Sequence, residues 1–394
     1  MDKNYLHLAS FSDIVPFAAG QAPLYPRAAP GAETVRAVGD ALGFCAGPES
    51  PLQVRVERQW QSDGLLGEEI SWWVGYGPRT HAFFLRPAGA RGPLPAVLAL
   101  HDHGGFKWLG KEKIAQGPEQ PPEMILRFWE RYYGGRAWAN ALAQQGFAVL
   151  VHDTFLWGSR RFQWDELPQQ VRDTADALYE KIPPSPGHEA QPSPGHEAQP
   201  SDGIPPEVAR YHLAVNQHEH VVAKYLNLLG TCLGGVVSRE DRIAFNYLLS
   251  RSEVDPARAG CLGLSGGGNR STLLRATHPG VRAAGIVGLM STYEGLLDHN
   301  VNHTWMLYPT YWSRHGDWPD IAACRAPLPL LVQYDRDDDL FTLEGMQAAD
   351  QRICAHYTSV GAAAAYTGRF YPGPHKFDLE MQAAAFAWFQ QNLA

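Results

Sequence analysis

The stretch CLGLSGGGNRST, residues 261–272, decides between two folds. Its glycines surround Ser265, and such a Gly-rich stretch is similar to a phosphate-binding loop. A Walker loop, however, needs Lys after its second glycine, where this chain has Asn269. The dinucleotide-binding fingerprint fails too, because Ser271 stands where its third glycine belongs. The stretch therefore argues against a phosphate site.

The same stretch contains GLSGG, residues 263–267, which matches the G-x-S-x-G pattern of a nucleophile elbow. It follows an apolar run at 259–265 and precedes a helical segment, the strand–turn–helix context that this motif requires. Glycines beside the serine let a strained, sharp turn form. We therefore interpret Ser265 as a nucleophile and the amide of Gly266 as a donor to an oxyanion.

The pattern outward from this stretch indicates an α/β fold. Alternating segments at 52–60, 68–76 and 80–88 predict N-terminal antiparallel strands. From residue 94 onward, short apolar runs alternate with helical segments, at 95–101, 147–153, 259–265, 282–290, 327–335 and 365–373. Continuous apolar runs are typical of strands buried on both faces. The chain is thus predicted to form a mostly parallel, doubly wound sheet.

The domain organisation follows from these elements. We expect an N-terminal extension at 1–50 and one catalytic domain at 51–394, with insertions at about 154–240 and 291–320 that act as lids. The segment SPGHEAQP occurs twice in tandem within the Pro-rich stretch 182–206, which predicts a flexible loop. Its histidines, His188 and His196, are interpreted as duplicated loop sequence rather than metal ligands.

Composition restricts the partners. The net charge is -8, from 33 basic and 41 acidic residues, and no basic cluster occurs, which argues against binding to nucleic acid or to an anionic membrane. No segment approaches the roughly 18 apolar residues of a membrane span, and the first residues lack a secretory signal. The five cysteines show no CxxC spacing and suit a reducing compartment. We expect a cytoplasmic protein, with its oligomeric state left open.

A nucleophilic serine needs a base, and the base needs a carboxylate. The segment DRDDDLF, residues 335–341, follows one predicted strand and supplies Asp335, Asp337, Asp338 and Asp339. His375 follows the next strand, just before the last helix. Singly, the aspartates suit a solvated turn or helix cap, and the histidine suits a surface loop. Together and in this order they predict a catalytic triad.

The second oxyanion donor is expected in LHDHGGF, residues 100–106, after the first parallel strand. Its glycines let the backbone turn its amides into the site, and we assign the amides of Gly105 and Phe106 to this role. His101 and His103 are expected to hold this loop through ring hydrogen bonds rather than to bind a metal.

These segments resemble the α/β-hydrolase superfamily, and more narrowly its bacterial dienelactone-hydrolase-like and acetyl-xylan-esterase-like branch. The matching pieces are HDHGGFKWLGKEK, VLVHDTFLWGSR, GLSGGG, DWPDIAACRAPLPLLVQYDRDDDLF and GPHKFDLEMQAAAFAWF, and they cover roughly residues 70–394. The resemblance implies Ser265 as nucleophile, His375 as base and an acid within 335–339. Dienelactone hydrolases use a cysteine nucleophile, so the serine argues against that reaction.

The resemblance also ranks the acids. In this branch the acid loop often reads Gly-x-x-Asp followed by Leu-Phe-Pro. Alignment on Leu340 and Phe341 makes Asp338 the acid, with Asp337 as second choice. This chain departs from the pattern at two positions, because Asp335 replaces the glycine and Thr342 replaces the proline.

Aromatic and charged residues in the insertions suggest further roles. Trp157, Trp305 and Trp312 are candidates for substrate binding, and packing within the lids explains them equally well. His218 and Glu219 lack the second histidine of a zinc-protease motif, so a helix-face or core role is preferred for them. Asp153 and Arg160 are expected to pair near the rim of the site.

The sequence thus predicts a serine hydrolase that cleaves carboxylic esters through an acyl-enzyme. The expected partner is a small-molecule ester, and neither a metal nor an organic cofactor is required. Two alternatives stay open. A serine peptidase or amidase would use the same residues, and a binding protein could carry a hydrolase fold without its chemistry.

Overall fold

The core of the molecule is a single nine-stranded sheet, seen in a computed structural model that describes residues 5–44, 47–181, 203–297 and 299–393. The strand order is β1-β2-β3-β5-β4-β6-β7-β8-β9. The strands are β1 (Leu52–Ser62), β2 (Leu65–Trp73), β3 (Thr80–Pro87), β4 (Leu94–Leu100), β5 (Ala148–His152), β6 (Val254–Leu264), β7 (Ala283–Val287), β8 (Leu330–Asp335) and β9 (Tyr366–Tyr371).

Strand directions match the predicted pattern. β1, β2 and β3 form an antiparallel meander, and β3 also runs antiparallel to β5. Every later pair, from β5–β4 to β8–β9, is parallel. The prediction of a mostly parallel sheet with N-terminal antiparallel strands is confirmed. Because the strands are parallel, the loops after β4, β6, β8 and β9 emerge at one edge.

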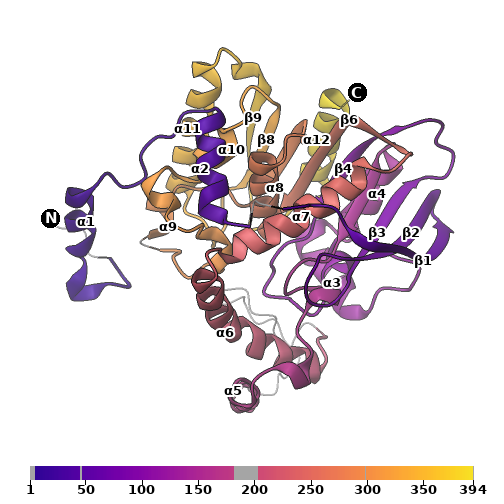
Figure 1. Cartoon of the computed structure of the whole chain (residues 1–394), viewed down its shortest axis with the longest axis horizontal. Helices are drawn as coiled ribbons and strands as arrows, with labels where there is room; N and C mark the ends of the chain where they lie inside the picture. The colour runs from indigo at the N-terminus through magenta and orange to yellow at the C-terminus, as the bar shows by residue number, and fades with distance from the viewer. Residues whose placement is uncertain (1–4, 45–46, 182–202, 298, 394) are drawn as a thin grey trace.

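Helices cover both faces of this sheet (Figure 1). One face carries α2 (Ala32–Leu42), α7 (Leu233–Leu249), α8 (Gly266–Thr277), α10 (Trp318–Ala323) and α11 (Leu343–Ser359). The other carries α3 (Glu123–Tyr133), α4 (Trp138–Gln144) and α12 (Leu379–Asn392). The remaining α-helices are α1 (Ile14–Gln21), α5 (Gln169–Tyr179), α6 (Pro206–Leu228) and α9 (Tyr293–Leu297).

The two-sided cover explains the continuous apolar runs. Successive side chains of a strand point to opposite faces. In β4, Leu98 and Leu100 enter the core on one face, while Val97 and Ala99 enter the core on the other. All four are buried. Polar residues have no place on such a strand, so the sequence shows no alternation.

The segments expected to lie outside the sheet and its helical layers pack in different places. In the 154–240 segment, α5 and α6 pack on each other away from the sheet (Figure 1), whereas α7 returns to cover it. The SPGHEAQP repeat, with His188 and His196, lies outside the described residues. Within the expected N-terminal extension, α2 packs into the core through Val38 and Leu42, so residues 32–42 belong to the helical layer.

The described helices differ from membrane spans in length or apolar character. Within the described ranges, no single helix has the length and apolar character to cross a bilayer. The pair α6 and α7, bent by 81° at the break between them, meets the criterion only when the two helices are taken together.

A buried ion pair joins the helices to the loop after β4. Arg270 on α8 donates to Asp241 on α7, with a shortest distance of 2.7 Å between Nη2 and Oδ1. Its Nη1 also donates to the carbonyl of His101 at 3.2 Å. Arg270 and Asp241 are both almost fully buried. The pair therefore fixes two helices and the β4 loop relative to one another.

Asp241→Asn is expected to destabilise the protein, because it leaves the Arg270 guanidinium buried without its counter-charge. Removing one partner of a buried ion pair costs about 3–5 kcal/mol. The free energy of unfolding in urea measures this cost. Glu123→Gln, which removes the exposed partner of Arg127 on α3, is the control and should change stability by less than about 1 kcal/mol. Equal effects of the two variants would contradict a structural role for the buried pair.

Candidate active site

Ser265 lies at the turn between β6 and α8. Its backbone has φ 56° and ψ -120°, in the left-handed half of conformational space that non-glycine residues avoid. Such a residue costs on the order of 1–3 kcal/mol and persists where its surroundings hold it. Here the Ser265 amide donates to Val287 at 2.8 Å, and its carbonyl accepts from Asn269 at 2.9 Å.

The glycines around Ser265 are required by close packing. A Cβ on Gly267 would overlap the carbonyl oxygen of Leu100 at the end of β4. A Cβ on Gly263 would lie 2.5 Å from the carbonyl carbon of Gly267. The first turn of α8 therefore sits directly against β4 and β6. The G-x-S-x-G pattern is the sequence form of this contact.

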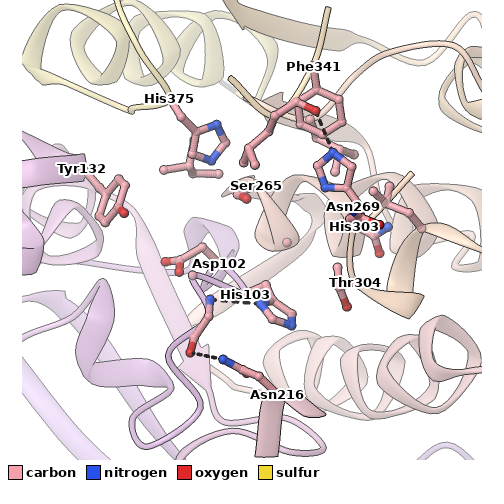
Figure 2. Close-up of a pocket in the computed structure, with 18 of the residues that line it drawn as sticks. Asp102, His103, Tyr132, Asn216, Ser265, Asn269, His303, Thr304, Phe341 and His375 are labelled. Atoms are coloured by element: carbon pink, nitrogen blue, oxygen red, sulfur yellow. Dashed lines mark hydrogen bonds between the residues drawn. The ribbon is translucent and has the colours of Figure 1, made fainter. Parts of the chain in front are cut away.

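His375 and Asp338 form a tight pair next to this turn. His375 lies between β9 and α12, and its Nδ1 is 2.6 Å from Oδ2 of Asp338, which follows β8. The other oxygen of Asp338 accepts the amide of Leu340 at 2.8 Å. With Nδ1 bonded to the carboxylate, Nε2 is the ring nitrogen of His375 that can face another group. Figure 2 shows Ser265 beside His375 in the cavity that both line.

Charges around His375 favour its protonated form. Burial lowers the pKa of His375, but the carboxylates of Asp338, Asp335 and Asp102 outweigh burial and raise it above the ordinary value of 6.5. The structure distinguishes Asp338 from Asp337, the two candidate acids of the sequence, because only Asp338 bonds to His375. Asp337 is exposed, and its carboxylate accepts the amide of Gly373 at 2.7 Å instead of approaching His375.

The backbone of His103 approaches Ser265 from the loop after β4. A Cβ on Gly266 would lie 2.5 Å from the backbone nitrogen of His103. The Gly266 amide is the first of α8 and has no acceptor within the helix. The amide of His103 likewise donates to none of the described residues. Two free amides therefore lie together beside the serine.

The donors expected at Gly105 and Phe106 are engaged elsewhere. The Gly105 amide donates to Nδ1 of His103 at 3.0 Å, and the Phe106 amide donates to the carbonyl of His103 at 3.2 Å. Both bonds close the loop on itself. The amides of Gly105 and Phe106 are therefore engaged within the loop, whereas the amide of His103 donates to none of the described residues. His103 also holds the loop through its ring, as expected.

Glu219 on α6 joins this loop to the second insertion. Its Oε2 lies 2.6 Å from Nζ of Lys107 and 3.0 Å from Nε2 of His103. Its Oε1 accepts the hydroxyl of Thr304 at 2.7 Å and the amide of Trp305 at 3.1 Å. One buried carboxylate thus connects α6, the loop after β4 and the 291–320 insertion.

The charges of this cluster are balanced. Burial raises the pKa of Glu219, but Lys107 and His103 outweigh it and hold that pKa well below its usual range. Burial lowers the pKa of His103. Because Nδ1 of His103 accepts from Gly105, the neutral ring carries its proton on Nε2 and donates it to Glu219. Glu219 therefore fixes both the tautomer and the position of His103.

The cavity above Ser265 has a volume of about 670 Å³. Its walls come from the loops after the strands, from α6 and from the 291–320 insertion (Figure 2). None of the described residues that line it is Lys or Arg. The polar lining residues besides Ser265 and His375 are Asp102, His103, Tyr132, Asn216, Gln217, Asn269, Asn302, His303 and Thr304.

Two residues of the cavity wall carry side-chain acceptor atoms. Asn269 donates through Nδ2 to the carbonyl of Met306 at 3.1 Å, while its buried Oδ1 accepts from no residue in the described ranges. His303 lies 2.7 Å through Nε2 from the carbonyl of Leu340, so Nε2 carries the proton and Nδ1 is an acceptor in the neutral ring. Burial lowers the pKa of His303 and favours that form.

The three tryptophans are not among the residues that line the cavity. Trp312 is fully buried in the main core. Trp157 donates to the carbonyl of His103 at 3.2 Å and so supports the loop from behind. Trp305 donates to His220 at 2.8 Å on α6. Smaller polar residues of the insertions line the cavity in their place, and a substrate-binding role for the three tryptophans stays a prediction.

The expected pair of Asp153 and Arg160 is also absent. Asp153 instead accepts the amide of Lys111 at 2.7 Å and faces its ammonium at 3.3 Å. Arg160 pairs with Glu240 at 2.5 Å. Sequence reasoning also missed the roles of Glu219, Asn269 and His303. The signal for Glu219 was its place beside His218, which drew attention only as an incomplete metal motif.

Glu219→Gln is expected to destabilise the protein in a pH-dependent way. At pH 7 the loss of the carboxylate leaves Lys107 buried without a counter-charge, at a cost of about 3–5 kcal/mol. Because the folded pKa of Glu219 is depressed, its contribution is present above the unfolded pKa and is lost as pH falls through the folded value. Urea unfolding of both proteins at neutral and acidic pH measures the difference, which should shrink on acidification.

Glu207→Gln, at an exposed position in the first turn of the same helix, is the matched control and should leave the stability nearly unchanged at both pH values. A Glu219→Gln variant as stable as wild type at pH 7 would contradict the role given to this carboxylate.

Comparison with known proteins agrees with the fold. No protein-family model matches the chain. The Bacillus subtilis (strain 168) protein YtaP, named as a hydrolase, is 23% identical over 324 residues, which cover 80% of this chain and 84% of that protein.

Solved structures superpose over most of the chain. A Bacteroides fragilis NCTC 9343 protein described as an acetyl xylan esterase (BF1801) has a TM-score of 0.60 at 18% identity, over 86% of this chain and 73% of that one. A glucuronoyl esterase from Solibacter usitatus has a TM-score of 0.56 at 13% identity, over 92% of both chains. With its elbow after β6 and its helices on both faces of the sheet, the chain has the α/β-hydrolase fold.

Proposed function

We propose that this protein is a serine hydrolase that cleaves carboxylic esters through an acyl-enzyme. The observation that carries the proposal is the strained Ser265 beside a His375–Asp338 pair joined at 2.6 Å. Backbone strain of this kind marks functional sites. The esterase descriptions of the structural neighbours favour esters over amides as the first substrates to test.

The first half of the reaction forms the acyl-enzyme. Nε2 of His375 takes the proton of the Ser265 hydroxyl as its oxygen attacks the ester carbonyl. The amides of Gly266 and His103 donate to the oxyanion of the tetrahedral intermediate. Asp338 stabilises the imidazolium. When the intermediate collapses, the carbon–oxygen bond to the alcohol breaks and the imidazolium gives its proton to the departing oxygen.

The second half repeats these steps with water. His375 takes a proton from water, whose oxygen attacks the acyl carbonyl of Ser265. The intermediate then releases the carboxylic acid and returns the proton to the serine oxygen. No step draws on a group beyond the chain, the ester and water, in keeping with the expectation that neither metal nor cofactor is required.

The cavity supports a neutral, hydroxyl-bearing ester as substrate. Its lining holds polar side chains at Gln217, Asn302 and His303, which suit the hydroxyl groups of a sugar. The described lining residues include no Lys or Arg that would pair with a substrate carboxylate. We therefore propose an acyl ester of a neutral sugar, such as an acetylated xylose, in preference to an ester of a uronic acid.

Ser265→Ala is expected to abolish turnover of esters, since it removes the nucleophile. The kcat for p-nitrophenyl esters, acetate to octanoate, should fall roughly 10³-fold or more, as for other triad deletions. Wild type should also release acetate from acetylated xylose faster than methanol from a methyl glucuronate. The measurements are p-nitrophenol release by absorbance and acetate or methanol release by enzymatic detection.

Ser252→Ala, in an exposed turn before β6, is the control and should match wild type. A fluorophosphonate probe should label wild type and the control but leave Ser265→Ala unlabelled. Turnover of esters by Ser265→Ala at the wild-type rate would contradict the proposal. Turnover of amides in preference to esters would favour the peptidase or amidase alternative. A folded wild type that neither reacts with the probe nor turns over any substrate would favour the non-catalytic alternative.

A further inference from the structure

A second carboxyl group lies beside the catalytic pair. Asp335 is the last residue of β8, and it is fully buried. Its Oδ2 accepts the amide of Lys376, the residue after His375, at 3.1 Å. Its Oδ1 is buried and accepts from no residue in the parts of the chain that the structure describes. An unpartnered buried carboxyl oxygen is costly, so its retention here calls for an explanation.

The explanation lies in its distance from the histidine. Polar atoms of Asp335, Asp338 and His375 all lie within 4.8 Å of one another. Asp338 bonds to Nδ1 of the ring, and a carboxyl oxygen of Asp335 lies within 4.8 Å of a ring nitrogen. The sequence has an aspartate here where the resembled enzymes have glycine. The imidazole is thus flanked by two buried carboxyl groups instead of one.

The surroundings of Asp335 raise its pKa well above the usual range of an aspartate. Its pKa is about 7, chiefly because burial raises it, and the charge of Asp338 adds to this rise. The charge of His375, the Lys376 amide and the Lys376 ammonium lower the pKa in part. The Lys376 ammonium itself pairs with Asp378 at 2.7 Å. A positive charge on His375 during the reaction favours the ionised form of Asp335. The two groups therefore respond to each other's charge.

We propose that Asp335 is a second acid for His375, which stabilises the imidazolium together with Asp338 and supports catalysis when the charge of Asp338 is removed. This inference rests on the proposed function. Asp335 acts as a positioning residue, because it touches neither the serine nor the ester: it holds the His375 loop through Lys376 and adds negative charge beside the ring.

The experiment compares Asp335→Asn, Asp338→Asn and the double variant across pH, with p-nitrophenyl acetate as substrate. Asparagine keeps an oxygen to accept the Lys376 amide, so Asp335→Asn removes charge with little change to the loop. We expect Asp338→Asn to lose far less than the roughly 10⁴-fold that removal of a sole triad acid costs. The double variant should lose at least about 10-fold more than Asp338→Asn.

The pH profile separates charge from structure. Asp335 raises the pKa of His375, so wild-type kcat/KM should fall on the acid side with an apparent pKa above 6.5. Asp335→Asn should move that acid limb to lower pH. Asp337→Asn, in the same loop with its carboxylate turned toward Gly373, is the matched control and should keep the wild-type limb. If Asp335→Asn does not fold, Asp335→Ser, whose hydroxyl also accepts an amide, replaces it.

The proposal is overturned if the double variant equals Asp338→Asn and the acid limb of Asp335→Asn coincides with that of Asp337→Asn. That result, with Ser265→Ala inactive, would leave the serine-esterase proposal intact. An active Ser265→Ala variant would instead remove the basis of both proposals.

Discussion

The close contact between the first turn of α8 and the end of β4 is the constraint on which the site depends. Glycine at 267 lets the helix touch the carbonyl of Leu100, and glycine at 266 lets the backbone of His103 come alongside. The serine between strand and helix is held in the left-handed region as a consequence. A side chain at either glycine would push the helix from the strand and separate the two amides beside Ser265.

Buried charges hold the remaining walls in place around this contact. The segment after β4 carries three buried lysines, each paired with a carboxylate: Lys107 with Glu219, Lys111 with Asp153 and Lys113 with Asp102. Buried ion pairs contribute little net stability, but breaking one is costly, so they specify a single arrangement of loops. The loop with the His103 amide is tied in this way to α6 and to the body. A preorganised oxyanion site needs such rigidity, because its donors must not reorganise during reaction.

The sequence was sufficient for the fold because each parallel strand is a separate apolar run and each gap holds a helix. The expected triad residues were found by the same logic, since Ser265, Asp338 and His375 each follow a strand, and the carboxyl ends of parallel strands share one edge. The structure places Ser265 and His375 in the wall of one cavity and pairs His375 with Asp338. Their chemical roles stay proposals. The acid was ambiguous by one residue, because sequence spacing does not say which way a turn directs Asp337 and Asp338.

Sequence reasoning failed where a role depends on packing between distant segments. The amides of Gly105 and Phe106, expected as oxyanion donors, are engaged with His103, because the loop folds back on its own ring; the donor proposed in their place is the His103 amide. The local signal for Glu219, its place beside His218, says nothing of its role, since its partners are about 85 to 116 residues away along the chain. The tryptophans were assigned to the cavity for their size, yet Trp312 fills the core. Large aromatic side chains serve a core and a cavity equally well, and the sequence does not distinguish the two.

The central claim is that Ser265 carries the acyl group during turnover. Mass spectrometry of peptides from wild-type protein, acid-quenched within the first turnovers of p-nitrophenyl acetate, tests it most directly. If Ser265 carries the acyl group, the peptide that contains Ser265 gains one acetyl group, at a level that rises with the burst of p-nitrophenol. Release of p-nitrophenol with that peptide unmodified, or with the acetyl group on another residue, would contradict it.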